Sequence, residues 1–171
     1  MKVDKKEWES KLNNLHTRTK GITSEHQIDY KSLLKKVFIG ESVLDVGCGT
    51  CWLKNYLKKS TKYTGLDAFI SGKEIITQSI EEIDFNTFQH RFDTLFVFAA
   101  LDGMMDLEKA FENMKAICNK NIVILTGINI QPDLYHTHLI TEQLVTNLMD
   151  GFKQTHKTQV HEKILFLEYT K

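Results

Sequence analysis

The residues of this chain whose types and spacing could carry chemistry are two glycines and two aspartates. Asp45, Gly47 and Gly49 form the pattern D-x-G-x-G, and Asp67 lies 20 residues after Gly47. Glycines at this spacing allow a tight turn and a close approach of the backbone to a ligand. A carboxylate accepts both hydroxyl protons of a cis-diol, and an acidic residue at this distance suits a ribose. The pattern therefore fits a ribosyl cofactor.

Strands and a helix must position these residues. Residues 41–57 predict a buried strand, a glycine turn and then a helix that Thr50 caps, with Leu53 and Leu57 on one face. Residues 62–67, KYTGLD, predict the next strand, which ends in the carboxylate. This arrangement places a helix N-terminus, with its free N–H groups, at the carboxyl edge of a parallel sheet. An anionic or strongly polar cofactor group is expected to bind there.

The glycine loop departs from a dinucleotide fingerprint, which needs a third glycine or an alanine where this chain has Trp52. The sequence VLDVGCGT instead resembles the cofactor loop of class I S-adenosylmethionine-dependent methyltransferases. The resemblance implies an α/β fold, a Rossmann-like three-layer sandwich. Its sheet would be mostly parallel and seven-stranded, with an antiparallel last strand.

The same resemblance implies contacts to S-adenosylmethionine along the carboxyl edge of the sheet. The glycine loop would pass beneath the methionine end, Asp45 would help to orient the amino group, and Asp67 would bind the ribose. Residues after the second and third strands would surround the adenine, and the fourth strand would end beside the transferred methyl. The implied cofactor-binding residues are Asp45, Gly47, Cys48, Gly49, Asp67, Ala68, Phe69, Ser79, Ile80 and Phe98.

The rest of the chain predicts further elements of this fold. Asp106 and Thr141 are expected to cap two helices. Only AFISGK separates Asp67 from the next apolar run, so the crossover helix after the second strand is expected to be shortened or missing. The further strands are expected at residues 75–79, 92–101, 121–126, 152–158 and 164–169.

The first 40 residues predict a helical cap on a single methyltransferase-like domain, whose core would span residues 41–171. One helix is expected over residues 4–20, and a second is expected to begin at Ser24, which has capping-box spacing to Gln27. In related methyltransferases such segments often cover the substrate mouth. The alternative is that these helices only cover the edge of the sheet.

Methyl transfer from a sulfonium is an in-line displacement in which alignment and exclusion of water matter most. A base is needed only when the acceptor must lose a proton, and Asp102 or His136 would then supply it. The alternative is that both residues only lie near the pocket. The chain lacks the Asn-Pro-Pro-aromatic motif, a cysteine near the fourth strand and a separate substrate domain. The acceptor is therefore expected to be a small molecule rather than a nucleic acid or a protein.

Two other interpretations stay open. Cys48 and Cys51 form C-G-T-C after a strand, which is also how a thioredoxin-like redox pair is presented. Cys51 moreover holds the place of the third glycine of the loop. The chain could therefore bind S-adenosylmethionine without transferring a methyl group, or serve as a structural partner. A metal site at Asp133, His136 and His138 is a poor fit, because no further ligand group is evident, and no metal is predicted.

Composition excludes several classes of protein. Lysine plus arginine and aspartate plus glutamate number 22 each, so nothing demands a polyanionic partner. No apolar run approaches the roughly 18 residues of a membrane helix, and the first residues show no signal-peptide core. Three cysteines and one proline favour a reducing, cytoplasmic setting. No pattern in the sequence predicts the oligomeric state.

Overall fold

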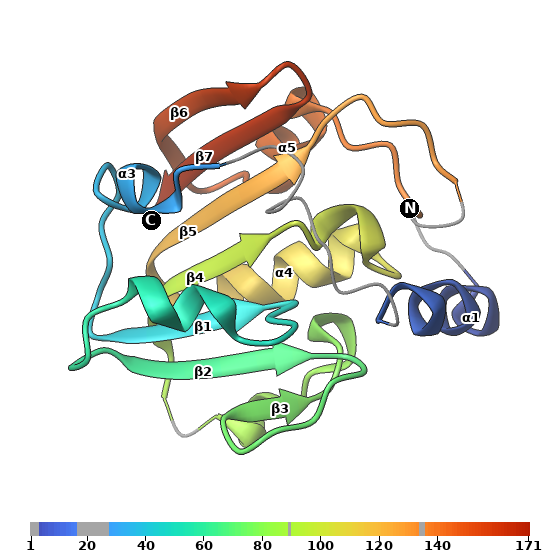
Figure 1. Ribbon diagram of the computed structural model, residues 1–171, viewed down its shortest axis with the longest axis horizontal. Coiled ribbons are helices and arrows are strands. Elements are labelled where there is room, and N and C mark those ends of the chain that lie inside the picture. Colours follow the sequence, from blue (N-terminus) through green and yellow to red (C-terminus); the bar gives the residue numbers. More distant parts are fainter. Residues whose placement is uncertain (1–3, 17–27, 89, 134–135) are drawn as a thin grey trace.

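One seven-stranded sheet organises the chain, in the order β3-β2-β1-β4-β5-β7-β6 (Figure 1). The computed structural model describes residues 4–16, 28–88, 90–133 and 136–171. The strands are β1 (Ser42–Val46), β2 (Lys62–Asp67), β3 (Ile75–Thr77), β4 (Phe92–Phe98), β5 (Cys118–Gly127), β6 (Lys153–His161) and β7 (Ile164–Thr170). β1 to β5 pair in parallel, and β7 runs antiparallel to both β5 and β6. The mostly parallel sheet with a closing hairpin is confirmed.

β1 and β4 lie in the middle of the sheet, and their sequences are apolar because both faces are covered. Val43, Leu44 and Val46 of β1 are buried. The register pairs Val46 with Leu66 of β2 on one side and with Val97 of β4 on the other. The three strands therefore end at the same level, and the loops that follow them meet at one edge.

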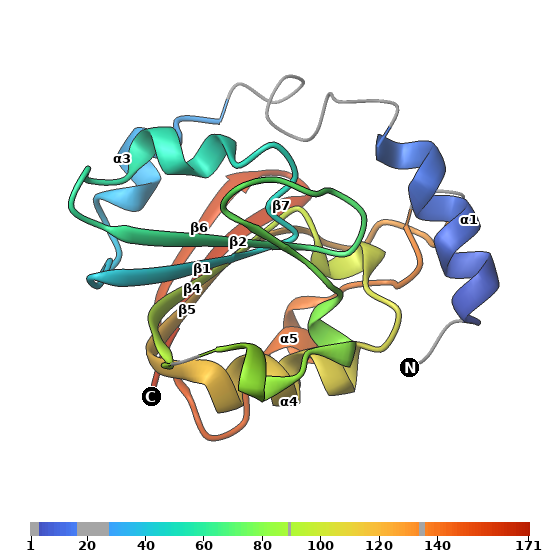
Figure 2. The same cartoon turned by 90° about the horizontal axis from the view of Figure 1, so that it is seen from below.

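Helices cover both faces of the sheet, which makes three layers (Figure 2). The helices are α3 (Tyr30–Leu34), η1 (Trp52–Tyr56), α4 (Leu107–Ile117) and α5 (Glu142–Leu148). Phe111 and Met114 of α4 pack with Leu44 in the apolar cluster of one face. Leu33 of α3 and Leu53 of η1 belong to the cluster of the opposite face. The predicted three-layer sandwich is therefore confirmed.

The connection between β1 and β2 differs from the prediction. It is one short 3-10 helix, η1, rather than an α-helix capped by Thr50. Cys51 occupies the N-cap position in the left-handed conformation (φ 59°) without a side-chain cap bond, and Leu57 is extended (φ −89°, ψ 159°). Because both ends depart from helical geometry, no long helix aims its N-terminus at the sheet edge. Contacts to a ligand here must come from the loop itself.

The connection between β2 and β3 contains no helix, as the short AFISGK segment predicts. Residues 68–74 carry the chain directly into β3, which pairs in parallel with β2 from Gly65↔Ile75 to Asp67↔Thr77. Two 3-10 turns, η2 (Ile80–Glu82) and η3 (Phe85–Thr87), then lead to β4. The sheet at β2 and β3 therefore has less helical cover than at β4 and β5.

Other predicted boundaries hold to within a few residues. β4 ends three residues earlier than expected, and β5 begins three residues earlier. Both predicted caps are confirmed: Asp106 accepts the backbone N–H of Lys109, and Thr141 accepts that of Leu144. In the part of the chain that the structure describes, no helix has the length and apolar character needed to span a bilayer.

The N-terminal helix α1 (Lys5–His16) lies beyond the carboxyl ends of β1, β2 and β4 (Figure 1). The indole Nε1–H of Trp8 donates to the carbonyl of Gly103, at 2.6 Å, and the indole packs on Phe69 with ring centroids 5.1 Å apart. Lys5 pairs with Glu82 at 2.7 Å. Helix α1 thus contacts the chain after β2, β3 and β4.

The second predicted helix, from Ser24, falls outside the described residues. Within the described part, α3 begins after Asp29, whose carboxylate accepts the backbone N–H of Ser32. Of the N-terminal helices, α1 therefore reaches the carboxyl edge of the sheet, and α3 covers one of its faces.

Candidate functional site

The loop after β1 is built around two glycines in left-handed conformations. Gly47 has φ +71°, and a Cβ there would lie 2.5 Å from the Cβ of Ala100 after β4. Gly49 has φ +51°, and a Cβ there would meet no described atom within 4 Å. Gly47 is therefore required by the close approach of two loops. Gly49 instead borders open space, where a ligand could lie against bare backbone.

Asp67, at the end of β2, ties the two loops together. Its side chain is 5% exposed. Oδ2 accepts the backbone N–H of Gly49 at 3.0 Å, and Oδ1 accepts those of Phe69 at 3.0 Å and Ile70 at 3.1 Å. The carboxylate predicted to bind a ribose thus sits beside the predicted glycine loop, as the spacing of the two motifs requires.

Asp45 lies under the same loop, in the middle of the sheet, and is 3% exposed. The hydroxyl of Tyr63 donates to its Oδ2 at 2.7 Å. Burial raises the pKa of Asp45 to about 7, although the bond from Tyr63 opposes the shift. The charge of Asp45 consequently changes near neutral pH. Its predicted contact with an amino group stays a prediction.

The two cysteines of the loop lie together, with 3.8 Å between their sulfur atoms. A Cβ on Gly65 of β2 would approach Cys48 Sγ to 2.7 Å, so the glycine makes room for the pair. Cys48 is 2% exposed, and burial, followed by the charge of Asp45, raises its thiol pKa well above the ordinary value. Reactive redox cysteines have the opposite character, with exposed, acidic thiols. The geometry at Cys48 therefore disfavours a thioredoxin-like activity.

The remaining predicted cofactor residues line the edge or lie just beneath it. Ala68 and Phe69 are half-buried in the loop after β2. The hydroxyl of Ser79 is buried, and it interacts with the carboxylate of Glu81. The side chains of Ile80 and Phe98 belong to the apolar clusters on the two faces of the sheet. Ile80 could therefore meet a ligand only through its backbone.

The two predicted catalytic residues come together from separate loops. Asp102 follows β4 in η4 (Leu101–Gly103), and its Oδ2 lies 3.4 Å from Nε2 of His136. Nδ1 of His136 lies 2.9 Å from Oδ1 of Asp133. Burial raises the pKa of Asp102, and the charge of His136 opposes that shift. The imidazole is thus held between two carboxylates.

Backbone bonds fix this second loop in place. The N–H groups of Thr137 and His138 both donate to the carbonyl of Asp102, at 2.6 and 3.2 Å. His138 is buried. The described residues contain no group of three histidine, cysteine, aspartate or glutamate side chains that could hold a metal ion. The structure therefore offers no support for the metal alternative.

Backbone strain is found at the same edge. Besides Cys51, Ala99 adopts the left-handed conformation, with φ 53°, directly after the last residue of β4. Such conformations cost about 1–3 kcal/mol each in non-glycine residues, and they cluster at functional sites. Both strained residues adjoin the loops that carry Gly49 and Asp102. The strain supports the assignment of this edge as the functional one.

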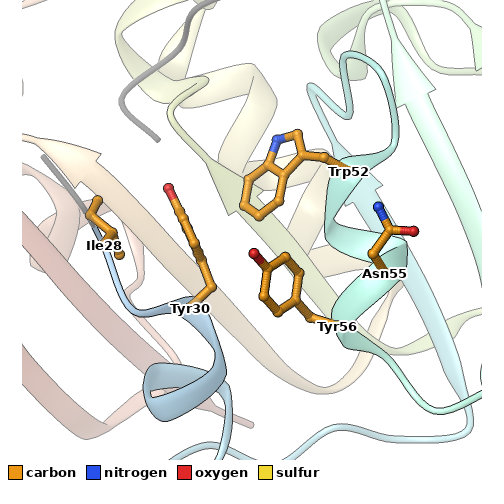
Figure 3. A pocket seen from close by; sticks show the side chains of 5 residues that line it. All are labelled: Ile28, Tyr30, Trp52, Asn55 and Tyr56. Atoms are coloured by element: carbon orange, nitrogen blue, oxygen red, sulfur yellow. The ribbon is translucent and has the colours of Figure 1, made fainter. Parts of the chain in front are cut away.

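Sequence reasoning missed an aromatic pocket beside the glycine loop. Figure 3 shows Ile28, Tyr30, Trp52, Asn55 and Tyr56 around a cavity of about 350 Å³. The spacing of Trp52 and Tyr56, four residues apart in η1, was the available signal. It could not identify the partner ring of Tyr30, which is distant in sequence. Sequence reasoning also missed that Trp8 contacts the loops at the carboxyl edge of the sheet.

No protein-family model matches this chain, and neither does any curated protein sequence. Solved structures do match. A Burkholderia thailandensis 1,6-didemethyltoxoflavin-N1-methyltransferase, with bound 1,6-didemethyltoxoflavin and S-adenosylhomocysteine, superposes with a TM-score of 0.74 at 15% identity, over 99% of this chain and 91% of that one.

Two further solved structures give the same result. The N-methyltransferase NodS from Bradyrhizobium japonicum WM9, with S-adenosyl-l-homocysteine, has a TM-score of 0.70 at 13% identity and covers 96% of this chain and 98% of its own. A SAM-dependent methyltransferase from Aquifex aeolicus has a TM-score of 0.68 at 14% identity, and the match covers 92% of this chain and 97% of that one. The chain therefore has the Rossmann-like fold of S-adenosylmethionine-dependent methyltransferases.

Proposed function

We propose that the protein binds S-adenosylmethionine at the carboxyl edge of β1, β2 and β4 and transfers its methyl group to a small molecule. The observation that carries the proposal is the bond between Asp67 and Gly49, beside the open space at Gly49. It brings the carboxylate that is predicted to bind the ribose diol close to the open space at Gly49. The fold shared with methyltransferases that were crystallised with S-adenosylhomocysteine supports the choice of cofactor.

The residues present fit this cofactor at its methionine end. A side chain at Gly49 would fill the open space, whereas glycine leaves room for the methionine end. Asp67 would hold the ribose, Ala68 and Phe69 the adenine ring, and the Gly47–Gly49 backbone the methionine end. When bound, S-adenosylmethionine supplies a methyl group already activated on a sulfonium.

The task of the protein is then to align the acceptor and to exclude water. We assign the exclusion of water to α1, because Trp8 joins the loops after β2 and β4 across the edge. Where the acceptor must lose a proton, His136 would take it. Asp133 would hold the ring through Nδ1, and Asp102 faces Nε2.

The small-molecule acceptor is supported by the similar Burkholderia enzyme, which holds 1,6-didemethyltoxoflavin. The equal numbers of basic and acidic residues in this chain give no electrostatic reason for a nucleic-acid substrate. We also propose a reducing, cytoplasmic setting, because all three cysteines are free thiols.

A second candidate is a protein that binds the cofactor without transfer, or a structural partner. One observation favours the structural partner. The loop after β1 uses its N–H donors internally, since Gly47 and Cys48 both donate to Leu66 and Gly49 donates to Asp67. Cofactor binding without turnover would support this candidate over the enzyme.

Labelled cofactor tests the proposal. The protein is incubated with [methyl-¹⁴C]-S-adenosylmethionine and a small-molecule extract, with the Asp67→Ala variant as the control. Label is expected to appear in a low-mass compound with the parent protein only. Label in nucleic acid or protein would contradict the small-molecule acceptor. A parent that binds cofactor but transfers no label would favour the second candidate.

A further inference from the structure

The aromatic pocket is the feature that the proposed cofactor site does not use. Its five lining residues come from the chain before α3, from α3 itself and from η1 (Figure 3). A volume of about 350 Å³ lies within the range of small-molecule sites. We propose that this pocket binds an uncharged, planar aromatic ring system.

The pocket wall is built from three aromatic rings that brace one another. Tyr30 meets Trp52 in an edge arrangement, with ring centroids 4.5 Å apart, and Tyr56 at 5.8 Å. Trp52 and Tyr56 are nearly perpendicular, at 6.0 Å. Each of the three rings therefore contacts the other two. A planar ring gains edge or stacking contacts against such a wall that a puckered ring cannot make.

The charges around the pocket select an uncharged ligand. None of the five lining residues is ionised at neutral pH. The neighbouring Lys54 pairs with Glu74. Among the described residues that line the pocket, an anion would therefore find no counter-charge. A cation could use ring faces, but the edge contacts between Trp52 and its two neighbours already cover part of those faces.

Tyr30 supplies the polar contact. It is 5% exposed, and its hydroxyl is buried without a hydrogen-bond partner among the described residues. A buried unpaired hydroxyl lowers stability, so phenylalanine would suit a purely structural wall better. A ligand with a carbonyl or ring nitrogen would pair this hydroxyl. The amide of Asn55 offers a second donor and acceptor at the pocket.

The position of the pocket connects it with the proposed reaction. The rings of Tyr30 and Trp52 each lie 6.2 Å from the ring of Phe98, the last residue of β4. On the proposed function, β4 ends beside the transferred methyl. The aromatic ring system would then belong to the methyl acceptor, and this last step rests on the proposed function.

Binding to the cofactor-free protein tests the pocket by itself. The probe is 2-naphthamide, measured by calorimetry and by the indole N–H signals of Trp52 and Trp8 in NMR. Decahydronaphthalene-2-carboxamide keeps the amide but is puckered, 2-naphthoate is an anion, and tetramethylammonium is a cation. We expect 2-naphthamide to shift the Trp52 signal and to bind about 10-fold more tightly than each of the other three.

Matched variants locate the site. Tyr30→Phe removes only the hydroxyl. It is expected to lower the affinity for 2-naphthamide about 2- to 12-fold, the equivalent of one hydrogen bond, without lowering Tm. Tyr56→Leu is expected to lower the affinity for 2-naphthamide about 5-fold or more. Phe85→Leu is the control, because Phe85 and Tyr56 are similarly exposed (46% and 47%) but Phe85 lies outside the pocket. The control variant should bind like the parent.

Four results would overturn the inference: no binding of 2-naphthamide, equal binding of the puckered analogue, preference for either ion, or equal losses in Tyr56→Leu and Phe85→Leu. A Tyr30→Phe variant with lower Tm and unchanged affinity would overturn the role of the hydroxyl. Because S-adenosylmethionine is absent from the test, failure of the pocket is distinguishable from failure of the cofactor site. Cofactor binding is measured separately on the same sample.

Discussion

At the scale of single residues, the site depends on a few carboxylates whose partners are backbone groups or aromatic hydroxyls. Asp67 and the glycine loop were predictable, because their types and spacing indicate a ribosyl cofactor. The partners were not predictable, because they depend on strand register. Tyr63 reaches Asp45 only because β1 and β2 pair Val43 with Tyr63 and Asp45 with Gly65. Likewise, Asp102 and His136 were expected separately, and the fold of two loops brings them to 3.4 Å.

Replacing Asp67 by alanine should disrupt both the cofactor site and the loops that form it. The change removes the acceptor of three backbone N–H groups, at Gly49, Phe69 and Ile70. We expect affinity for S-adenosylhomocysteine to fall about 10-fold or more, since hydrogen bonds to a charged group contribute about 1.5–3 kcal/mol each. Calorimetry measures the affinity. Asp67→Asn keeps one acceptor oxygen and should lose less affinity than Asp67→Ala. Equal affinity of Asp67→Ala and the parent would refute the ribose assignment.

Asp45 should make the stability of the protein fall as pH rises. Its pKa is raised from about 3.9 in the unfolded chain to about 7 in the folded protein. The folded state therefore holds a proton that the unfolded state has lost between about pH 4 and pH 7, so stability decreases across that window. The shift corresponds to about 4 kcal/mol at most.

Urea unfolding of the parent and of Asp45→Asn at pH 5 and pH 8 measures this effect. The asparagine variant keeps an acceptor for Tyr63 and should show a smaller loss of stability between the two pH values. Other buried carboxyls, such as Asp102, contribute in the same direction in both proteins. The same pH dependence in both proteins would show that Asp45 does not titrate in this window.

At the scale of elements, the strands were predictable and the short connections were not. The strand at residues 62–67 was predicted with its observed bounds, because its apolar run and terminal carboxylate define it. The helix after β1 was mispredicted, because the left-handed backbone of Cys51 replaces the cap that Thr50 would form. Sequence could not place α1 either, because Trp8 carries no local signal of its contacts with Phe69 and Gly103.

Helix α1 should control how quickly ligand leaves the site. Trp8→Ala removes both the bond to Gly103 and the contact with Phe69, and it should speed release of S-adenosylhomocysteine about 5-fold, the equivalent of one hydrogen bond. Stopped-flow displacement measures the rate. Trp8→Phe keeps a ring on Phe69, and its release rate should lie between those of the parent and the alanine variant. An unchanged release rate in Trp8→Ala would show that α1 does not cover the bound ligand.

At the scale of the whole molecule, the fold was predictable and the acceptor was not. Alternating strands and helices, with a short glycine turn after the first strand, indicate a mostly parallel sheet and the edge at which its loops meet. The acceptor depends on surfaces assembled from distant segments. The pocket at Tyr30 and Trp52 joins residues before β1 to residues after it, and no sequence spacing links them. The fold therefore locates the cofactor edge but leaves substrate choice to the side chains around it.

Calorimetric titration of the purified, reduced and ligand-free protein tests the central claim most directly. S-adenosylmethionine and S-adenosylhomocysteine are each titrated, with NAD as the control. The proposed site predicts saturable binding of both sulfur compounds at one site and no binding of NAD, because the loop lacks the third glycine of a dinucleotide fingerprint. Absence of binding by either sulfur compound, in protein shown to be folded and empty, would contradict the cofactor site and with it the proposed methyl transfer.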